Sequence, residues 1–293
     1  MALGLGIMTP VVTLAPGSHA SWERDGTIDD VVRIAQAADR LGYDHLTCSE
    51  HVAVPTSAVP VRGGRYWDPL ATFGYVAART ERIRLLTDVL VLGYHHPLEI
   101  AKRYGTLDRI SGGRLVLGLG VGSLEEEFTL LGVPFADRGA RADDHLRALR
   151  ASLSTPEPTY DGPYYRYEGV VVEPCAVQER VPLWIGGRTA RSLRRAVELG
   201  DGWCPFGLGV DDIARLLAAA TTTDAWAARG VALDVVIQNQ PPLDPLGAGE
   251  AARVAVRALT AAGTTILSLR LVHHSVDHYI EQLEAMVHVV ASA

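Results

Sequence analysis

Cysteine is scarce in this chain of 293 residues, which contains only Cys48, Cys175 and Cys204. Their spacing matches no metal or redox motif, and an odd number argues against a framework of disulfides. The first residues, MALGLGIMTPVV, also lack the charged start of a secretory signal peptide. From these two absences we expect a protein of the reducing cytoplasm.

Long apolar runs and an excess of positive charge are also missing. No apolar run approaches the roughly 20 residues that a membrane-spanning helix needs. The formal net charge of −7 leaves no basic field to hold a phosphate backbone or an anionic membrane. We therefore expect no nucleic acid and no membrane as partner, and a small molecule as substrate. The oligomeric state stays open, with a homodimer as one candidate.

The most informative stretch is GRLVLGLGVGSLEEEF, residues 113–128. Its apolar residues do not alternate with polar ones, which is typical of a parallel strand buried on both faces. Gly118, Gly120 and Gly122 follow where this strand ends, so backbone amides could approach a planar or anionic ligand there. The alternative is a tight turn that needs glycine. A dinucleotide fingerprint is disfavoured because the spacing is G-x-G-x-G and no acidic residue closes a second strand.

Strand-like and helix-like segments alternate along the whole chain, in the number expected for a (β/α)8 TIM barrel formed by one domain, residues 1–293. The predicted strands are Leu3–Met8, Tyr43–Cys48, Ile83–Leu92, a fourth starting at Arg114, Pro182–Ile185, Gly202–Phe206, Leu233–Gln238 and Thr264–Leu271. Between the fourth helix and the fifth strand, residues 156–182 predict a surface hairpin or extended excursion. One long helix is predicted over Asp211–Arg229.

Functional groups of such barrels lie where the strands end at their carboxyl side, and this rule selects the candidates. They are Glu50, His51, Tyr94, His95, His96, residues 120–123, residues 186–189, Cys204, Gln238, Arg270, His273 and His274.

Gly186, Gly187, Arg188 and Thr189 lie between a strand and a helix. Free amides, a helix start, an arginine and a hydroxyl therefore meet where a phosphate could bind. The alternative is an ordinary turn between a strand and a helix.

His51 is the best candidate for moving a proton. Beside Glu50, at a strand end that opens on the site, it could act as a proton donor or acceptor near neutral pH. Alone it would be read as a packing histidine.

Other polar residues have simpler interpretations. The histidine pairs 95–96 and 273–274 do not predict a metal site, because adjacent strand residues point to opposite faces. The glutamates at 125–127 are expected to complement the positive end of a helix. Trp184 and Trp203 are expected in the core.

The chain resembles the luciferase-like monooxygenase superfamily, and its coenzyme F420-dependent branch in particular. The resemblance is carried by SEHV (49–52), TDVLVLGYHHPLEIAK (87–102), TLDRISGGRLVLGLGVGSLEEEF (106–128), LGVPFADRGAR (131–141) and PLWIGGRTARSLRRAVELGDGW (182–203).

The resemblance implies a (β/α)8 barrel that binds F420 or FMN at its carboxyl-terminal mouth. It implies that Glu50 and His51 form an acid–histidine pair near the reacting carbon, and that a cis peptide near Asp88–Val89 backs the ring. It also places Gly120, Val121 and Gly122 beside the ring or its ribityl chain, and the phosphate at Gly186, Gly187, Arg188 and Thr189. Ser123 departs from the glutamate of similar glucose-6-phosphate dehydrogenases, which puts sugar-phosphate chemistry in doubt.

The leading functional hypothesis is therefore an F420-dependent oxidoreductase that transfers a hydride to or from a small organic substrate. The first alternative is an FMN-dependent monooxygenase. The second is a protein that binds a flavin or deazaflavin without turnover, which the titratable pair Glu50 and His51 argues against.

Overall fold

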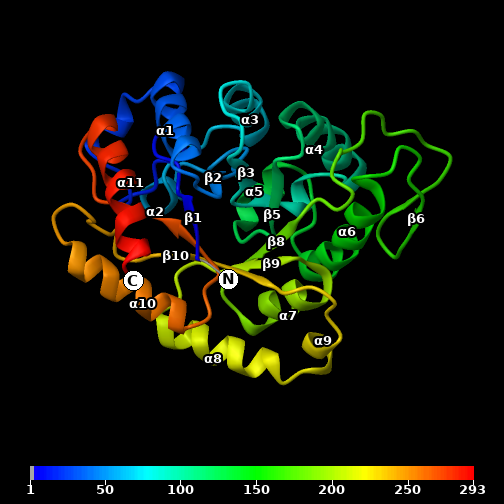
Figure 1. Cartoon of the computed structure of the whole chain (residues 1–293). Helices are drawn as coiled ribbons and strands as arrows, with labels where there is room; N and C mark the ends of the chain where they lie inside the picture. Colours follow the sequence, from blue (N-terminus) through cyan, green and yellow to red (C-terminus); the bar gives the residue numbers. More distant parts are fainter. Residues whose placement is uncertain (1–2) are drawn as a thin grey trace.

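Eight parallel strands close into a barrel in the computed structural model of this chain, which describes residues 3–293 (Figure 1). The predicted TIM barrel is thus confirmed. The strands are β1 (Gly4–Ile7), β2 (His45–Cys48), β3 (Arg84–Thr87) with its continuation β4 (Leu90–Val91), β5 (Leu115–Gly120), β8 (Leu183–Gly186), β9 (Gly202–Cys204), β10 (Asp234–Gln238) and β11 (Ile266–Leu269).

Closure depends on the pairing of β3 with β5, in which Leu85 lies beside Leu115 and Leu86 beside Val116. All six residues of β5 are buried, as its non-alternating sequence predicts. Gly118 is needed for this packing, because a Cβ there would lie 1.9 Å from the carbonyl oxygen of Thr87. The first of the three glycines therefore serves contact between strands, and not contact with a ligand.

The predicted strand over Ile83–Leu92 is interrupted in the structure. It is divided into β3 and β4 by the Asp88–Val89 link, whose peptide bond is cis. The bond lies where the family resemblance places it. Both parts pair with β5, so the interruption leaves the barrel closed.

Eight helices surround the barrel, one after each strand (Figure 1). They are α1 (Ile28–Arg40), α3 (Pro69–Ala77), α4 (Pro97–Ser111), α6 (Arg138–Ser152), α7 (Ala190–Leu199), α8 (Val210–Thr221), α10 (Gly249–Ala261) and α11 (Val276–Ala291). Short helical turns in the loops are η1 (Ser21–Arg24), α2 (Val59–Arg62), η2 (Leu92–Tyr94), α5 (Glu125–Leu130) and α9 (Asp224–Ala227).

The single helix predicted over Asp211–Arg229 is wrong in one respect, because it is split into α8 and α9. The hydroxyls of Thr221, Thr222 and Thr223 each donate to a carbonyl three residues earlier. Thr223 then accepts from the amide of Trp226 and so begins α9. Such side-chain hydrogen bonds compete with helix continuation.

The expected excursion is an antiparallel hairpin of β6 (Tyr160–Asp161) and β7 (Arg166–Tyr167), which projects at the edge of the barrel (Figure 1). Its tyrosines fasten it to α6. Tyr160 donates to Asp144 at 2.5 Å, and the hydroxyls of Tyr167 and Ser152 lie 2.6 Å apart.

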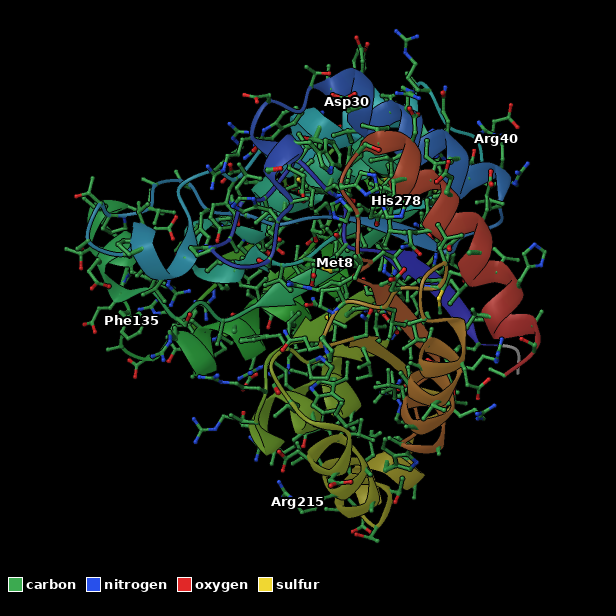
Figure 2. The ribbon with its side chains drawn as sticks, turned by 90° about the vertical axis from the view of Figure 1, so that its left-hand side faces the viewer. Met8, Asp30, Arg40, Phe135, Arg215 and His278 are labelled. Atoms are coloured by element: carbon green, nitrogen blue, oxygen red, sulfur yellow. The ribbon has the colours of Figure 1, made fainter. Side chains whose placement is uncertain are left out.

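The interior of the barrel holds the core and, above it, the polar groups described below. Met8 lies among the converging side chains at the centre of the molecule, whereas Arg40 and Arg215 project from the outer helices (Figure 2). Trp184 and Trp203 are fully buried, as predicted. Within residues 3–293, no helix has both the length and the apolar character that crossing a membrane requires.

Candidate active site

A pocket of about 430 Å³ opens where the barrel strands end at their carboxyl side. It brings together nine of the predicted residues: Glu50, His51, Asp88, Val89, Gly120, Val121, Gly122, Gly186 and Gly187. Arg188 and Thr189 do not line it. Tyr94, Ser123, Cys204, Gln238, Arg270 and His273, which the strand-end rule also selected, do.

His51 is held by a carboxylate that the sequence analysis did not assign to the site. Its Nδ1 lies 2.6 Å from Oε2 of Glu127, and the imidazole packs edge-on against the Tyr66 ring, with centroids 4.5 Å apart. Because a carboxylate only accepts, Nδ1 carries the proton and Nε2 is the nitrogen left to exchange one. The His51 side chain is 14% exposed and lines the pocket, which suits contact with a ligand.

Glu127 is fully buried and accepts four hydrogen bonds. Besides His51, the donors are the amides of Val52 and Ala53, at 2.7 and 3.1 Å, and the hydroxyl of Tyr94, at 2.7 Å. Burial opposes its ionisation, but the hydrogen bonds from Tyr94, Ala53 and His51 outweigh burial and lower the pKa of Glu127. Glu127 is therefore an anion that orients His51.

The expectation that all three glutamates at 125–127 complement a helix end is wrong for Glu127. The helix α5 has only six residues, and it turns Glu127 inward while Glu125 and Glu126 remain exposed. Helical spacing alone could have shown that one of three consecutive residues faces the protein.

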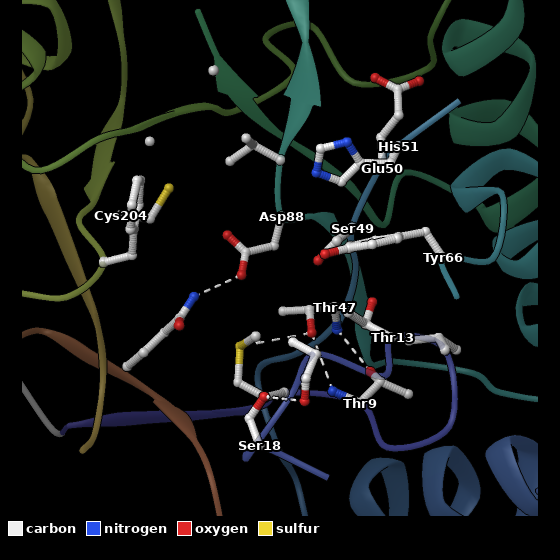
Figure 3. A pocket seen from close by; sticks show the side chains of 18 of the residues that line it. Thr9, Thr13, Ser18, Thr47, Ser49, Glu50, His51, Tyr66, Asp88 and Cys204 are labelled. Atoms are coloured by element: carbon white, nitrogen blue, oxygen red, sulfur yellow. Dashed lines mark hydrogen bonds between the residues drawn. The ribbon is translucent and has the colours of Figure 1, made fainter. Parts of the chain in front are cut away.

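Glu50 does not pair with His51. Its carboxylate accepts from the amide of Val91 at 2.8 Å and from Nε2 of His95 at 2.7 Å. Figure 3 shows the His51 ring turned toward the pocket and the Glu50 carboxylate directed away from it. Neighbouring residues at a strand end point in opposite directions. The predicted pair of Glu50 and His51 is therefore replaced by two pairs, His51 with Glu127 and Glu50 with His95.

The pair formed by Glu50 and His95 is largely shielded from solvent, with side chains 7% and 10% exposed. Burial alone would lower the pKa of His95, but the hydrogen bond from His95 to Glu50 and the charges of Glu50 and Glu99 together raise it. This pair ties β2 to the segment after β4, so we assign Glu50 a structural contact in this conformation.

Asp88 places a second titratable group in the pocket. Its Oδ2 accepts from Nε2 of Gln238 at 2.7 Å (Figure 3). Partial burial raises the pKa of Asp88 to about 6, against the opposing effects of Arg270 and Gln238. Arg270 also lines the pocket, and within residues 3–293 its Nε is buried without a hydrogen-bond partner.

Val89 lies between two of the predicted glycines. A Cβ at Gly120 would be 2.7 Å from Cγ2 of Val89, and a Cβ at Gly186 would be 2.9 Å from its Cγ1. The missing side chains therefore make room for Val89 in the pocket wall.

The loop 186–189 combines strain with an open helix start. Gly187 has φ +126°, and a Cβ there would meet Ser192 at 2.8 Å, so any side chain would distort the loop with or without a ligand. Thr189 begins α7 by accepting from the amide of Ser192. The first turn of α7 has no acidic residue, which leaves its positive end free to attract an anion.

The adjacent histidines His273 and His274 have different partners. His273 accepts from Nε1 of Trp22 at 3.0 Å, whereas the His274 ring lies against His278. Burial, with His278 and His274, lowers the pKa of His273 to about 4. In the described part of the chain, no three His, Cys, Asp or Glu side chains come together in a way that could hold a metal ion.

The chain is similar to known proteins along most of its length. The sequence profile of the luciferase-like monooxygenase family matches residues 5–285. A relative from Mycobacterium tuberculosis (strain ATCC 25618 / H37Rv), described as uncharacterized, is 31% identical over 223 residues, covering 69% of this chain and 77% of the relative. The F420-dependent glucose-6-phosphate dehydrogenase of Nocardia farcinica is 32% identical over 224 residues, covering 73% and 64%.

Solved structures share the fold at lower identity. Monooxygenase RslO1 from Streptomyces bottropensis superposes with a TM-score of 0.76 at 22% identity, over 99% of both chains. An F420-dependent secondary alcohol dehydrogenase in complex with an F420–acetone adduct gives 0.76 at 15% identity, over 99% of both. The oxygenating constituent of 3,6-diketocamphane monooxygenase of Pseudomonas putida, in complex with FMN, gives 0.75 at 17%, over 100% of this chain and 99% of the other.

Proposed function

Because the chain belongs to the luciferase-like monooxygenase family, we propose that it is an oxidoreductase that transfers a hydride between coenzyme F420 and a small organic substrate. The observation that carries the proposal is His51, which lines the pocket: a buried carboxylate holds Nδ1, and Nε2 has no hydrogen-bond partner within residues 3–293. A protein that only binds a cofactor has no need of an oriented proton carrier.

The residues of the pocket fit such a cofactor. Val89, set between Gly120 and Gly186, provides an apolar surface for one face of a planar ring. Gly187 and the first turn of α7 would hold the phosphate. Backbone amides at the start of a helix bind anions, and no acidic residue in this turn would repel one. Arg188 belongs to the same loop and adds positive charge to it, and its guanidinium lies 5.8 Å from the Phe206 ring.

The protein groups then have separate tasks. When bound, the cofactor would supply the carbon that gives or takes the hydride. His51 gives or takes the substrate proton at Nε2, and Glu127 holds the ring in place through Nδ1. Asp88, Gln238 and Arg270 line the same pocket and provide polar groups to which a substrate oxygen can be hydrogen-bonded.

FMN is the alternative cofactor, with an oxygen-inserting reaction in place of hydride transfer. The F420-dependent relative is 32% identical over 73% of this chain, whereas a 4-hydroxyprotoasukamycin monooxygenase is 34% identical over 43% of it. The longer match supports F420.

Direct binding distinguishes the two cofactors. Purified protein without cofactor is titrated with F420 and with FMN while their fluorescence is recorded. We expect saturable binding of F420 that is at least tenfold tighter than binding of FMN. Micromolar binding of FMN with no binding of F420 would replace the proposal by the monooxygenase.

Replacing His51 tests the proposed proton transfer. We expect His51→Asn to keep the fold and the cofactor affinity but to lower the single-turnover rate by about 10²–10⁴-fold, which is the usual contribution of a general acid or base. Melting temperature, cofactor affinity and rate are measured on one preparation. An unchanged rate with a lowered melting temperature would make His51 a packing residue.

A further inference from the structure

A second cavity of about 270 Å³ lies between η2, the start of α4 and α6. Tyr94 contributes to its wall and also to that of the large pocket. The other polar side chains that line it are His95, His96, Arg138, Arg141, His145 and Tyr165. No lining residue carries a carboxylate, and the negative partner of His95, Glu50, lies outside the lining. The cavity therefore combines hydrogen-bond donors with positive charge.

His145 lines this cavity and has one ring nitrogen without a hydrogen-bond partner in residues 3–293. The side chain is fully buried, and the hydroxyl of Tyr165 lies 3.3 Å from Nδ1. Within residues 3–293, Nε2 is buried and has no hydrogen-bond partner. Burial, with the neighbouring His95 and His96, lowers the pKa of His145 to about 3, so the ring is neutral. When the Tyr165 hydroxyl donates to Nδ1, the proton of the ring lies on Nε2.

His96 is fixed in the same tautomer. Its Nδ1 accepts from the amide of Leu98 at 3.2 Å at the start of α4, which leaves Nε2 to carry the proton. Burial lowers the pKa of His96, so it too is a neutral donor.

The two arginines bring charge without a carboxylate partner in the described chain. Arg138 donates through Nε to the carbonyl of Gly122 at 3.1 Å, and Arg141 lies over the Tyr164 ring with a buried, unpaired Nε. Other arginines nearby differ, since Arg150 and Arg195 are paired with Asp201 and Asp143.

Asp144, which precedes His145 in the sequence, is hydrogen-bonded elsewhere. Asp144 accepts from the hydroxyl of Tyr160 and from the amides of Tyr164 and Tyr165, so its charge is used to hold the hairpin.

We propose that this cavity binds a small oxyanion, the carboxylate or phosphate group of a metabolite. A buried polar donor is costly unless it is paired, and an oxyanion would pair His145 while neutralising Arg141. The planar guanidinium of Arg141 offers two parallel donors to such a group. The site is distinct from loop 186–189, which does not line this cavity.

Calorimetric titration of the full chain with inorganic phosphate and, separately, with succinate tests the proposal at low ionic strength. We expect saturable binding of at least one of them. Phosphate alone identifies a phosphate site, succinate alone a carboxylate site, and both a general oxyanion site. Arg141→Gln should weaken binding at least tenfold. Arg109→Gln, an exposed residue at the far end of α4, is the control and should bind as the natural chain does.

A second measurement does not depend on a variant. In protein labelled with ¹⁵N-histidine, the Nε2 resonance of His145 should move on titration with the anion that binds. The proposal is overturned when neither anion binds, when a folded Arg141→Gln binds as tightly as the natural chain, or when the His145 resonance does not move at saturation.

Discussion

At the scale of single residues, the orientation of His51 depends on Glu127. Replacing that carboxylate by an amide, Glu127→Gln, puts an N–H₂ group where Nδ1 and the Tyr94 hydroxyl both donate. We expect turnover to fall by about 10²-fold, at the low end of the loss for His51→Asn, and stability to fall by about 1–3 kcal/mol. Steady-state kinetics and urea unfolding measure both effects. Glu126→Gln is the matched control because Glu126 is the exposed neighbour, and an equal loss there would contradict the assignment.

Asp88 should make stability depend on pH. Its folded pKa of about 6 lies above its ordinary value of 3.8, so folding disfavours the ionised form. The sign follows from linkage: stability from this group is complete below pH 3.8 and is lost as the pH rises through 6. We expect Asp88→Asn to be more stable than the natural chain by on the order of 2–3 kcal/mol at pH 8.

This gain should shrink as the pH falls toward 4, because the natural side chain is then protonated. Urea unfolding of the two proteins at several pH values measures the difference. A difference that stays constant with pH would show that Asp88 titrates normally.

Sequence reasoning found His51 but misassigned its partner. Adjacency in sequence favoured Glu50, although the alternation that separated the histidine pairs also separates Glu50 from His51. Glu127 could not be distinguished from Glu125 and Glu126, because which of the three is buried depends on how α5 packs against the segment after β2. Contacts between segments far apart in the sequence determine which glutamate is buried, and a local sequence pattern does not contain them.

At the scale of elements, β8 can pack closely against the link between β3 and β4 because Gly186 has no side chain and Val89 occupies the space beside it. We expect Gly186→Ala to weaken cofactor binding at least tenfold, because the new methyl would displace Val89, 2.9 Å away. Val89→Ala in the same chain should restore part of the affinity, which fluorescence titration of the single and double variants measures. Equal losses in both variants would exclude a steric cause.

The elements themselves were largely predictable. Continuous apolar runs such as Leu115–Leu117 predict buried parallel strands, and β5 is buried along its whole length. The interruption of the third strand and the division of α8 from α9 were not visible in the periodicity. The first lies at one peptide bond and the second at three consecutive threonine hydroxyls, and neither changes the apolar pattern.

At the scale of the whole molecule, one barrel should unfold as one unit. Strands from both ends of the chain are neighbours, since β1 pairs with β11 and β3 closes on β5. We expect one calorimetric transition for the domain 1–293. Cofactor at 100 times its dissociation constant should stabilise it by about 2.7 kcal/mol and raise the melting temperature by roughly 4–5 °C. Two separate transitions, or a shift in only part of the protein, would contradict a single domain.

The four hydrogen bonds to Glu127 also couple the motions of three loops. The segment after β2 donates two amides, the segment after β4 donates Tyr94, and α5 supplies the carboxylate. A loop fastened to two others cannot open alone, so solvent should reach the amides of Val52 and Ala53 in a single opening event. Their deuterium exchange rates should therefore be slow and nearly equal, and should rise together when the carboxylate is removed.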